Sequence, residues 1–190
     1  MMKLLKQSFL MNVWLIALCG LAYPIVMTGA AQTLFRSKAD GSLVTKNGQV
    51  IGSELIGQGF SDAKYFHGRP SAAGNGYDPM ASGGSNLGPT SKALMDRVDK
   101  SVAGERTASG NSGAVPGDLV TTSGSGLDPD ISVAAALWQI PGVLKARPGL
   151  DEAVLRGLIG ANTEGRAFGI LGEPRVNVLK LNLALDALHP

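Results

Sequence analysis

The organisation of this chain follows from one stretch, FLMNVWLIALCGLAYPIVM (Phe9–Met27). No charged residue occurs between Lys6 and Arg36. About 20 apolar residues in a helix cross the ~30 Å hydrocarbon core of a bilayer, and a helix satisfies its own backbone hydrogen bonds there. The stretch predicts a transmembrane helix over residues 9–31, a short tail (1–8) before it and a soluble domain (32–190) after it.

The charges that flank the apolar stretch predict its orientation. Lys3 and Lys6 lie on the short side, and basic residues favour the cytoplasmic side of a membrane. Arg36 and Lys38 weaken this bias because they lie near the other end of the stretch. We expect a cytoplasmic N-terminus and a periplasmic C-terminal domain at a bacterial inner membrane.

The alternative is a cleaved signal peptide, which has a basic start, a short apolar core and a small-residue cleavage site. Gly29-Ala30-Ala31 before Gln32 fits such a site. The apolar core is longer than in most signal peptides, and it carries the bulky residues Trp14 and Tyr23. These features favour a retained anchor.

Charge and cysteine content narrow the function classes. The 190 residues include 17 Lys and Arg against 15 Asp and Glu, and the first two lysines precede the apolar stretch, so the soluble domain is formally neutral. A basic patch with interleaved aromatic residues is absent from the sequence, which argues against nucleic-acid binding. The single cysteine, Cys19, lies inside the apolar stretch, so no disulfide is expected in the soluble domain.

The soluble domain reads as a mixture of strands and helices. Asn47-Gly48, flanked by β-branched residues, predicts a β-hairpin over residues 42–53. Residues 71–88 are rich in Gly, Ser, Asn, Asp and Pro and predict a long loop. A helix is expected from Pro89 with Leu94, Val98 and Val102 inward, followed by a small-residue linker over 108–113 and a strand over 115–122. A second helix is expected from Asp128-Pro129 and is broken or kinked at Pro141. The last expected elements are a helix over 151–162 with Val154, Leu155, Leu158 and Ile159 inward, and a strand that turns into a terminal helix over 174–188. The predicted fold class is α+β (mixed α/β) behind a single transmembrane helix.

Two Gly/Ser loops have similar sequences. SGGSNLGP (Ser82–Pro89) resembles SGSGLDP (Ser123–Pro129), and each is expected to lead into a helix that begins at proline. Such a junction offers free backbone N–H groups and the positive end of a helix dipole, which suit anions. The simpler interpretation is that both loops are capped turns.

Motifs of catalysis are absent. The sequence has neither a Walker A loop nor a G-x-S-x-G nucleophile elbow. His67 and His189 are the only histidines, and they lack metal-ligand spacing. We therefore expect no catalytic residues and no metal site, and interpret His67 as a surface or packing residue.

Several loop sequences together resemble the C subunit family of the bacterial Kdp-type potassium-transporting ATPases. The resemblance runs in order over nearly the whole chain, the apolar stretch included. Its motifs are LIGQ (Leu55–Gln58), YFHGRPS (Tyr65–Ser71), SGGSNLGP (Ser82–Pro89), SGSGLDPDIS (Ser123–Ser132), and RVNVL with LN (Arg175–Leu179, Leu181–Asn182).

This resemblance implies a non-catalytic accessory subunit of an ATP-driven, high-affinity potassium uptake complex. The implied partners are a channel-like potassium-binding subunit, a P-type ATP-hydrolysing subunit, a small membrane peptide and the lipid bilayer. The implied roles are assembly and catalytic chaperoning, which raises the ATP affinity of the hydrolysing subunit. A cap over the outer ion entrance agrees better with an outer domain, because ATP is bound inside.

The resemblance also places the candidate site residues. No cofactor is expected to be tightly bound, and ATP is expected only through the complex. A nucleotide contact would fall on Ser123, Gly124, Ser125 and Gly126, although the Asp128 carboxylate would compete with phosphate. The hypothesised partner contacts are Trp14, Tyr65, Phe66, Arg69 and Asn86.

Two other classes of protein remain open. One is a secreted hydrolase with a cleaved signal, which would have a mature N-terminus at Gln32. The other is an anchored adhesion or ligand-binding module unrelated to transport, which would stay monomeric in detergent.

Overall fold

The computed structural model describes residues 1–188, so His189 lies outside the described residues. The chain divides into two compact units, Met1–Ile51 and the chain from Gly52 onward.

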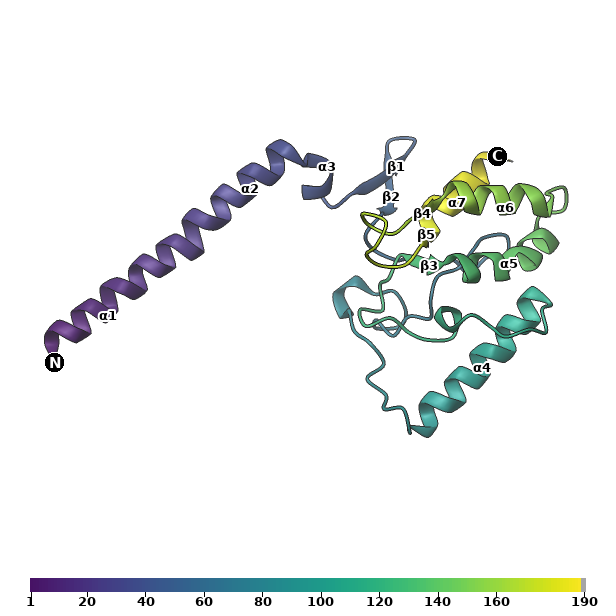
Figure 1. Cartoon of the computed structure of the whole chain (residues 1–190), viewed down its shortest axis with the longest axis horizontal. Helices are drawn as coiled ribbons and strands as arrows, with labels where there is room; N and C mark the ends of the chain where they lie inside the picture. Colours follow the sequence, from purple (N-terminus) through teal and green to yellow (C-terminus); the bar gives the residue numbers. More distant parts are fainter. Residues whose placement is uncertain (189–190) are drawn as a thin grey trace. The chain divides into compact units, whose positions relative to one another are not determined.

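The first unit is dominated by one long helix, drawn as a single rod in Figure 1. It comprises α1 (Met2–Leu15), a π-helical stretch (Ile16–Ala22) and α2 (Tyr23–Leu34). This helix of 33 residues is long and apolar enough to cross a membrane, a test that a signal sequence also passes. The predicted span, residues 9–31, lies inside this helix, and its bounds stay a prediction.

The π-helical stretch has a local cause. Pro24 has no N–H and its ring crowds the carbonyl four residues earlier, which disturbs the regular α-helical pattern. Just before it, the Tyr23 N–H donates to the Leu18 carbonyl, five residues back. The irregularity before Pro24 is therefore a wider turn within a continuous helix.

The predicted β-hairpin is confirmed. After a short helix, α3 (Arg36–Ala39), strands β1 (Leu43–Lys46) and β2 (Gln49–Ser53) pair with each other. Asn47 and Gly48 form the turn with φ of 53° and 77°. Two consecutive positive φ angles match the right-handed twist of a two-residue hairpin.

The second unit is built around a small antiparallel sheet of order β3-β5-β4. Its strands are β3 (Asp130–Ser132), β4 (Thr163–Glu164) and β5 (Arg175–Asn177). Ile131 lies opposite Val176 in the register. Both side chains are buried, which ties the centre of the sheet to the core.

The described part of the second unit contains four α-helices: α4 (Lys92–Ser109), α5 (Val133–Ala146), α6 (Glu152–Ala161) and α7 (Val178–Leu188). Helix α5 contacts α4, α6 and the sheet, and α7 contacts α6 and β5 (Figure 1). The mixed helices and short sheet confirm the α+β fold class. The fully buried large side chains that form the core are Phe66, Leu119, Ile140, Leu155, Ile159, Leu181, Leu185 and Val176.

The tail is confirmed as a strand followed by a helix, β5 and α7. The predicted long loop over 71–88 is also present, with one 3₁₀ turn at Pro79–Ala81. Helix α4 begins at Lys92 rather than Pro89, and it runs through Ala108 and Ser109, which the sequence assigned to a linker.

Two predicted elements between residues 115 and 133 are wrong. The expected strand over 115–122 contains a 3₁₀ turn at Gly117–Leu119, and the Asp118 carboxylate of this turn accepts hydrogen bonds from Ser132. The helix expected from Asp128-Pro129 begins at Val133, because Asp130–Ser132 pairs with β5 and Ser132 caps the helix. Strand pairing outweighs the local helix-start signal there.

Two smaller predictions also need correction. Pro141 does not end its helix, since α5 continues to Ala146. The Trp138 carbonyl, three residues before Pro141, accepts a hydrogen bond of 3.1 Å from Asn111, which adds a contact in the turn that the proline weakens. On α6, Leu155 and Ile159 point inward as predicted, but Val154 is exposed.

Candidate binding site

The two similar Gly/Ser loops pack against each other. The Gly83 N–H and the Ser82 hydroxyl both donate to the Ser125 carbonyl, at 2.8 and 3.0 Å. A Cβ added at Gly84 would lie 3.2 Å from the Gly124 carbonyl oxygen. Glycine therefore lets the two backbones approach, and the sequence echo marks a contact between the loops.

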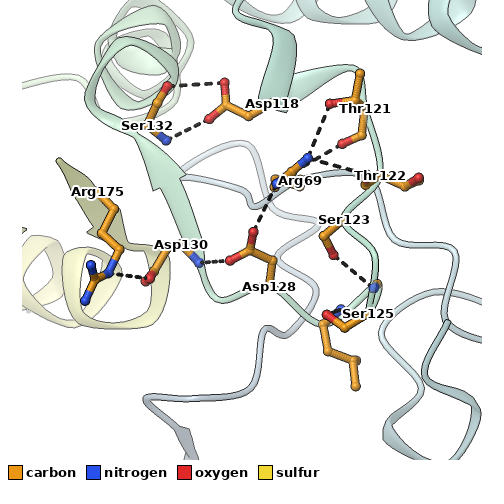
Figure 2. Close-up of polar contacts among 12 residues, drawn as sticks. Arg69, Asp118, Thr121, Thr122, Ser123, Ser125, Asp128, Asp130, Ser132 and Arg175 are labelled. Carbon is orange, nitrogen blue, oxygen red and sulfur yellow. Dashed lines mark hydrogen bonds and ion pairs between the residues drawn. The ribbon is translucent and has the colours of Figure 1, made fainter. Parts of the chain in front are cut away.

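Side chains inside the second loop occupy its backbone donors, as Figure 2 shows. The Gly126 N–H donates to the Ser123 hydroxyl at 2.9 Å, and the Leu127 N–H donates to the Ser125 hydroxyl at 3.1 Å. Gly126 adopts φ +69°, and a Cβ there would lie 2.7 Å from the Ala73 nitrogen. The loop is fixed by these contacts, and two of the N–H groups that an anion would use are already satisfied.

Arg69 holds the end of this loop (Figure 2). Its guanidinium lies 3.1 Å from an Asp128 carboxylate oxygen and also donates to the Thr121 and Thr122 carbonyls, at 3.4 Å each. The Tyr77 hydroxyl donates to the Arg69 carbonyl at 2.6 Å. Burial and the Asp128 charge raise the pKa of Tyr77, which keeps this hydroxyl protonated as a donor.

Two more carboxylates hold β3 beside the loop. Asp130 pairs with Arg175 at 2.9 Å and accepts a hydrogen bond from Asn177. Burial raises the pKa of Asp130, against the opposing effects of Asn177 and Arg175. Asp118 accepts from the Ser132 N–H at 2.7 Å. The loop therefore lies among acidic groups. The helix that was expected to begin at the end of this loop, at Asp128-Pro129, begins at Val133 instead.

Two hollows lie next to this region. An open hollow of about 450 Å³ is bordered by His67, Arg69 and Tyr77. A cleft of about 550 Å³ is lined by residues of α4, of α5 and of the segment before His67. Volumes of this size are in the range of small-molecule sites. The main lining residues of the cleft are Phe60, Tyr65, His67, Glu105, Gln139 and Val143.

His67 stands at the edge of both hollows. Its Nε2 lies 3.4 Å from a Glu105 carboxylate oxygen. Burial lowers the pKa of His67, but the hydrogen bond and the charge of Glu105 outweigh it, so the pKa is raised above 6.5. The ion pair between His67 and Glu105 links the segment that contains His67 to helix α4.

The backbone of Phe66 and His67, called the clamped segment here, is held by two side-chain amides. The Phe66 N–H donates to Asn182 at 2.9 Å, and the Asn182 amide donates to the Phe66 carbonyl at 2.8 Å. Gln139 makes the same pair of contacts with His67, at 2.8 and 3.1 Å. The two amides satisfy backbone groups that lie outside any helix or strand.

The structure places the hypothesised partner contacts in different environments. Phe66 is fully buried in the core, so its side chain is not available to a partner in this conformation. Tyr65 donates to Asp186, and Arg69 is paired with Asp128. Trp14 is 72% exposed on the apolar helix, and Asn86 is exposed in its loop. The partner contacts other than the Phe66 side chain therefore stay a prediction.

Sequence reasoning missed Gln139, Asn182 and Glu105. A polar amide between apolar neighbours was the available signal, since Gln139 follows Trp138 and precedes Ile140. Buried polar side chains require hydrogen-bond partners. A polar amide between apolar neighbours therefore predicts a hydrogen bond, but the sequence does not indicate with which residue. Among residues 1–188, no group of three or more His, Cys, Asp or Glu side chains is arranged to hold a metal ion.

The chain thus combines an apolar N-terminal helix that is long enough to cross a membrane with an α+β unit. The KdpC family model, described as "K+-transporting ATPase, c chain", matches residues 5–187. The chain therefore belongs to the KdpC family.

Relatives support the same assignment over the full length. The potassium-transporting ATPase KdpC subunit of Acidobacterium capsulatum is 54% identical over 188 residues, which cover 99% of this chain and all of the relative. The KdpC subunit of Rhodopseudomonas palustris strain BisB5 is 55% identical, with 98% of each chain covered. That of Koribacter versatilis is 50% identical, with 100% of this chain and 97% of the relative covered.

Proposed function

We propose that this chain is a non-catalytic accessory subunit of an ATP-driven potassium uptake complex. The observation that carries the proposal is the family match over residues 5–187, which includes the apolar helix as well as the second unit. The relatives are named subunits of a potassium-transporting ATPase. The partners are a channel-like potassium-binding subunit, a P-type ATP-hydrolysing subunit and a small membrane peptide.

The apolar helix is proposed to be a retained anchor with the N-terminus in the cytoplasm. Lys3 and Lys6 support this orientation. Ser112→Cys, at an exposed position, provides a reporter in the second unit. A membrane-impermeant maleimide should label it in intact cells with a permeable outer membrane. Labelling only after the inner membrane is broken would reverse the orientation.

The second unit is proposed to stabilise the complex and to cap the outer ion entrance. The formal neutrality of residues 32–190, which include this unit, supports this role, because a neutral domain would neither concentrate nor repel potassium by net charge. In this orientation the unit lies on the side opposite to the ATP site. Any increase in ATP affinity of the hydrolysing subunit must then pass through the anchor helix or the channel-like subunit.

We also propose a direct contact between a nucleotide and the loop residues Ser123, Gly124, Ser125 and Gly126. Gly124 and Ser125 are exposed and accessible to a ligand, whereas the donors at Gly126 and Leu127 are occupied. Gly124→Val combined with Ser125→Ala should weaken nucleotide binding by the purified chain. Unchanged binding would eliminate this contact and leave the indirect route.

The main test is affinity purification of a C-terminally tagged chain from membranes of potassium-starved cells, followed by mass analysis. Recovery of a P-type ATPase and a channel-like subunit with the uncleaved chain is the expected result. A lone soluble protein that begins near Gln32 would support the secreted alternative. An uncleaved chain that stays monomeric would support an anchored ligand-binding module.

A further inference from the structure

The loop that joins β4 to β5 (residues 165–174) presents three large apolar side chains to solvent. Phe168 is 93% exposed, Ile170 75% and Leu171 58%. These three residues are called the apolar tip here. Large apolar side chains that gather at one exposed place indicate an interaction site, whereas isolated ones do not.

Hydrogen bonds fix the backbone of the apolar tip. The Ala167 N–H donates to the Leu171 carbonyl at 2.8 Å, and the Leu171 N–H donates back at 2.9 Å. The Gly169 and Ile170 N–H groups donate to the Arg166 and Ala167 carbonyls, at 3.0 and 3.2 Å. A partner that covers the tip would leave few backbone groups unsatisfied, and little conformational entropy would be lost.

Phe168 carries two unfavourable features. Phe168 adopts φ +54°, a left-handed conformation that is rare for a bulky residue. Its side chain is also almost completely exposed. A backbone outlier of this kind motivates a hypothesis of function, and here the exposed ring indicates contact with another molecule.

The charges around the tip favour a protein partner over a lipid surface. Arg166 pairs with Glu173 at 2.8 Å, and Arg175 pairs with Glu164 at 2.8 Å. Arg175 also pairs with Asp130 at 2.9 Å, so both cations at the base of this loop are paired with carboxylates. Lipid-binding segments carry an excess of Lys and Arg, whereas an apolar centre with a neutral polar rim is typical of protein interfaces.

We propose that the apolar tip inserts into an apolar recess on the protein surface of another subunit of the same ATPase. This inference rests on the proposed function, since it requires that the chain is a subunit of a complex. It assigns the contact to a surface different from Tyr65, Phe66 and Arg69, which are engaged inside the domain. Phe168 is the expected anchor because exposed aromatic side chains often dominate interface energies.

Photo-crosslinking in the complete complex tests the contact directly. A benzophenone-bearing amino acid replaces Phe168 in the tagged chain, membranes are irradiated, and adducts are identified by mass analysis. The matched control carries the same amino acid at Met80, which is 92% exposed in a different loop. An adduct between position 168 and another subunit, and a much weaker one at position 80, is the expected result. Adducts with lipid alone, with a second copy of this chain, or with no molecule would overturn the proposal.

A double variant measures the contribution of the tip to assembly. Phe168→Asn with Ile170→Ser removes two apolar side chains, and asparagine tolerates the left-handed backbone. We expect at least about tenfold less co-purified partner subunit after a detergent wash, with Met80→Ser unchanged. Equal retention would refute the docking proposal. A wild-type chain that recovers no other subunit would refute the proposed function itself.

Discussion

The clamped segment and the apolar tip lie in two short stretches of similar composition, but the phenylalanine of the first is buried and that of the second is exposed. The surrounding sequences, Tyr65-Phe66-His67-Gly68-Arg69 and Arg166-Ala167-Phe168-Gly169, each combine phenylalanine, glycine and arginine. Phe66 is 0% exposed and Phe168 is 93% exposed. The difference shows that the helices around a segment, and not its composition, decide whether it serves the core or the surface.

The partners of the backbone explain this difference. The clamped segment obtains its hydrogen bonds from Asn182 on α7 and Gln139 on α5, which hold it inside the unit. The apolar tip closes hydrogen bonds within itself and needs no neighbouring element. A segment clamped by distant helices should be sensitive to substitution, and a self-contained loop should tolerate it.

The largest expected effect is on Phe66. Phe66→Ala removes a fully buried ring and leaves a cavity, which should lower the free energy of unfolding by about 3–5 kcal/mol. The matched Phe168→Asn should change it by less than about 0.5 kcal/mol, because its ring is exposed. Urea unfolding of the full chain in detergent, followed by circular dichroism, measures both. Equal losses in the two variants would contradict the comparison.

Gly126 and Gly124 extend the comparison to the junction of the two Gly/Ser loops. Gly126→Ala should cost about 2–4 kcal/mol, because the backbone is left-handed and the added Cβ meets Ala73 and Gly83. Gly124→Ala has open space around the added Cβ and should cost well below 1 kcal/mol. The same unfolding assay applies. A stable Gly126→Ala variant would mean that the loops separate easily.

Asn182→Ala tests the clamp itself. The substitution leaves the buried N–H and carbonyl of Phe66 without partners, and we expect a loss of about 2–3 kcal/mol. Asn75→Ala, at an exposed loop position, is the control with the same chemical change and should be nearly neutral. Increased amide hydrogen exchange at Phe66 in the first variant only would localise the effect.

The smallest expected effect concerns the His67–Glu105 pair and depends on pH. Glu105 raises the pKa of His67 above 6.5 in the folded chain. The stabilisation is therefore fully present below pH 6.5 and is lost as pH rises through the folded pKa. Wild type should exceed Glu105→Gln in stability at pH 6 by less than about 1 kcal/mol, because the pair is partly solvated. The gap should narrow by pH 8.5, and a gap that widens would contradict the assigned sign.

Local signals in the sequence predicted much of the fold. The Asn47-Gly48 turn, the α6 apolar positions Leu155 and Ile159, and the strand-to-helix tail depend on short-range periodicity and turn chemistry. Asp128-Pro129 failed as a helix start because the next three residues pair with β5, some 45 residues later in the chain. Short-range preference cannot anticipate a partner strand at that distance.

The candidate site was less predictable than the fold. The sequence echo correctly drew attention to the loops 82–89 and 123–129, but not to the contact between them. It also suggested an anion site at a helix start, whereas the structure places Asp128 and Arg69 there as a pair. The clamping amides Gln139 and Asn182 carried only the weak signal of a polar residue on an apolar helix face.

The sequence by itself determined the apolar helix, the lack of disulfides in the second unit, the α+β class and the family. These properties depend on composition, on periodicity, or on motifs that lie in order along the chain. The tertiary structure alone decided which phenylalanine is buried, which loops meet and which apolar side chains remain exposed. Those outcomes depend on contacts between residues far apart in sequence, whose energies arise only when the helices and the sheet pack together.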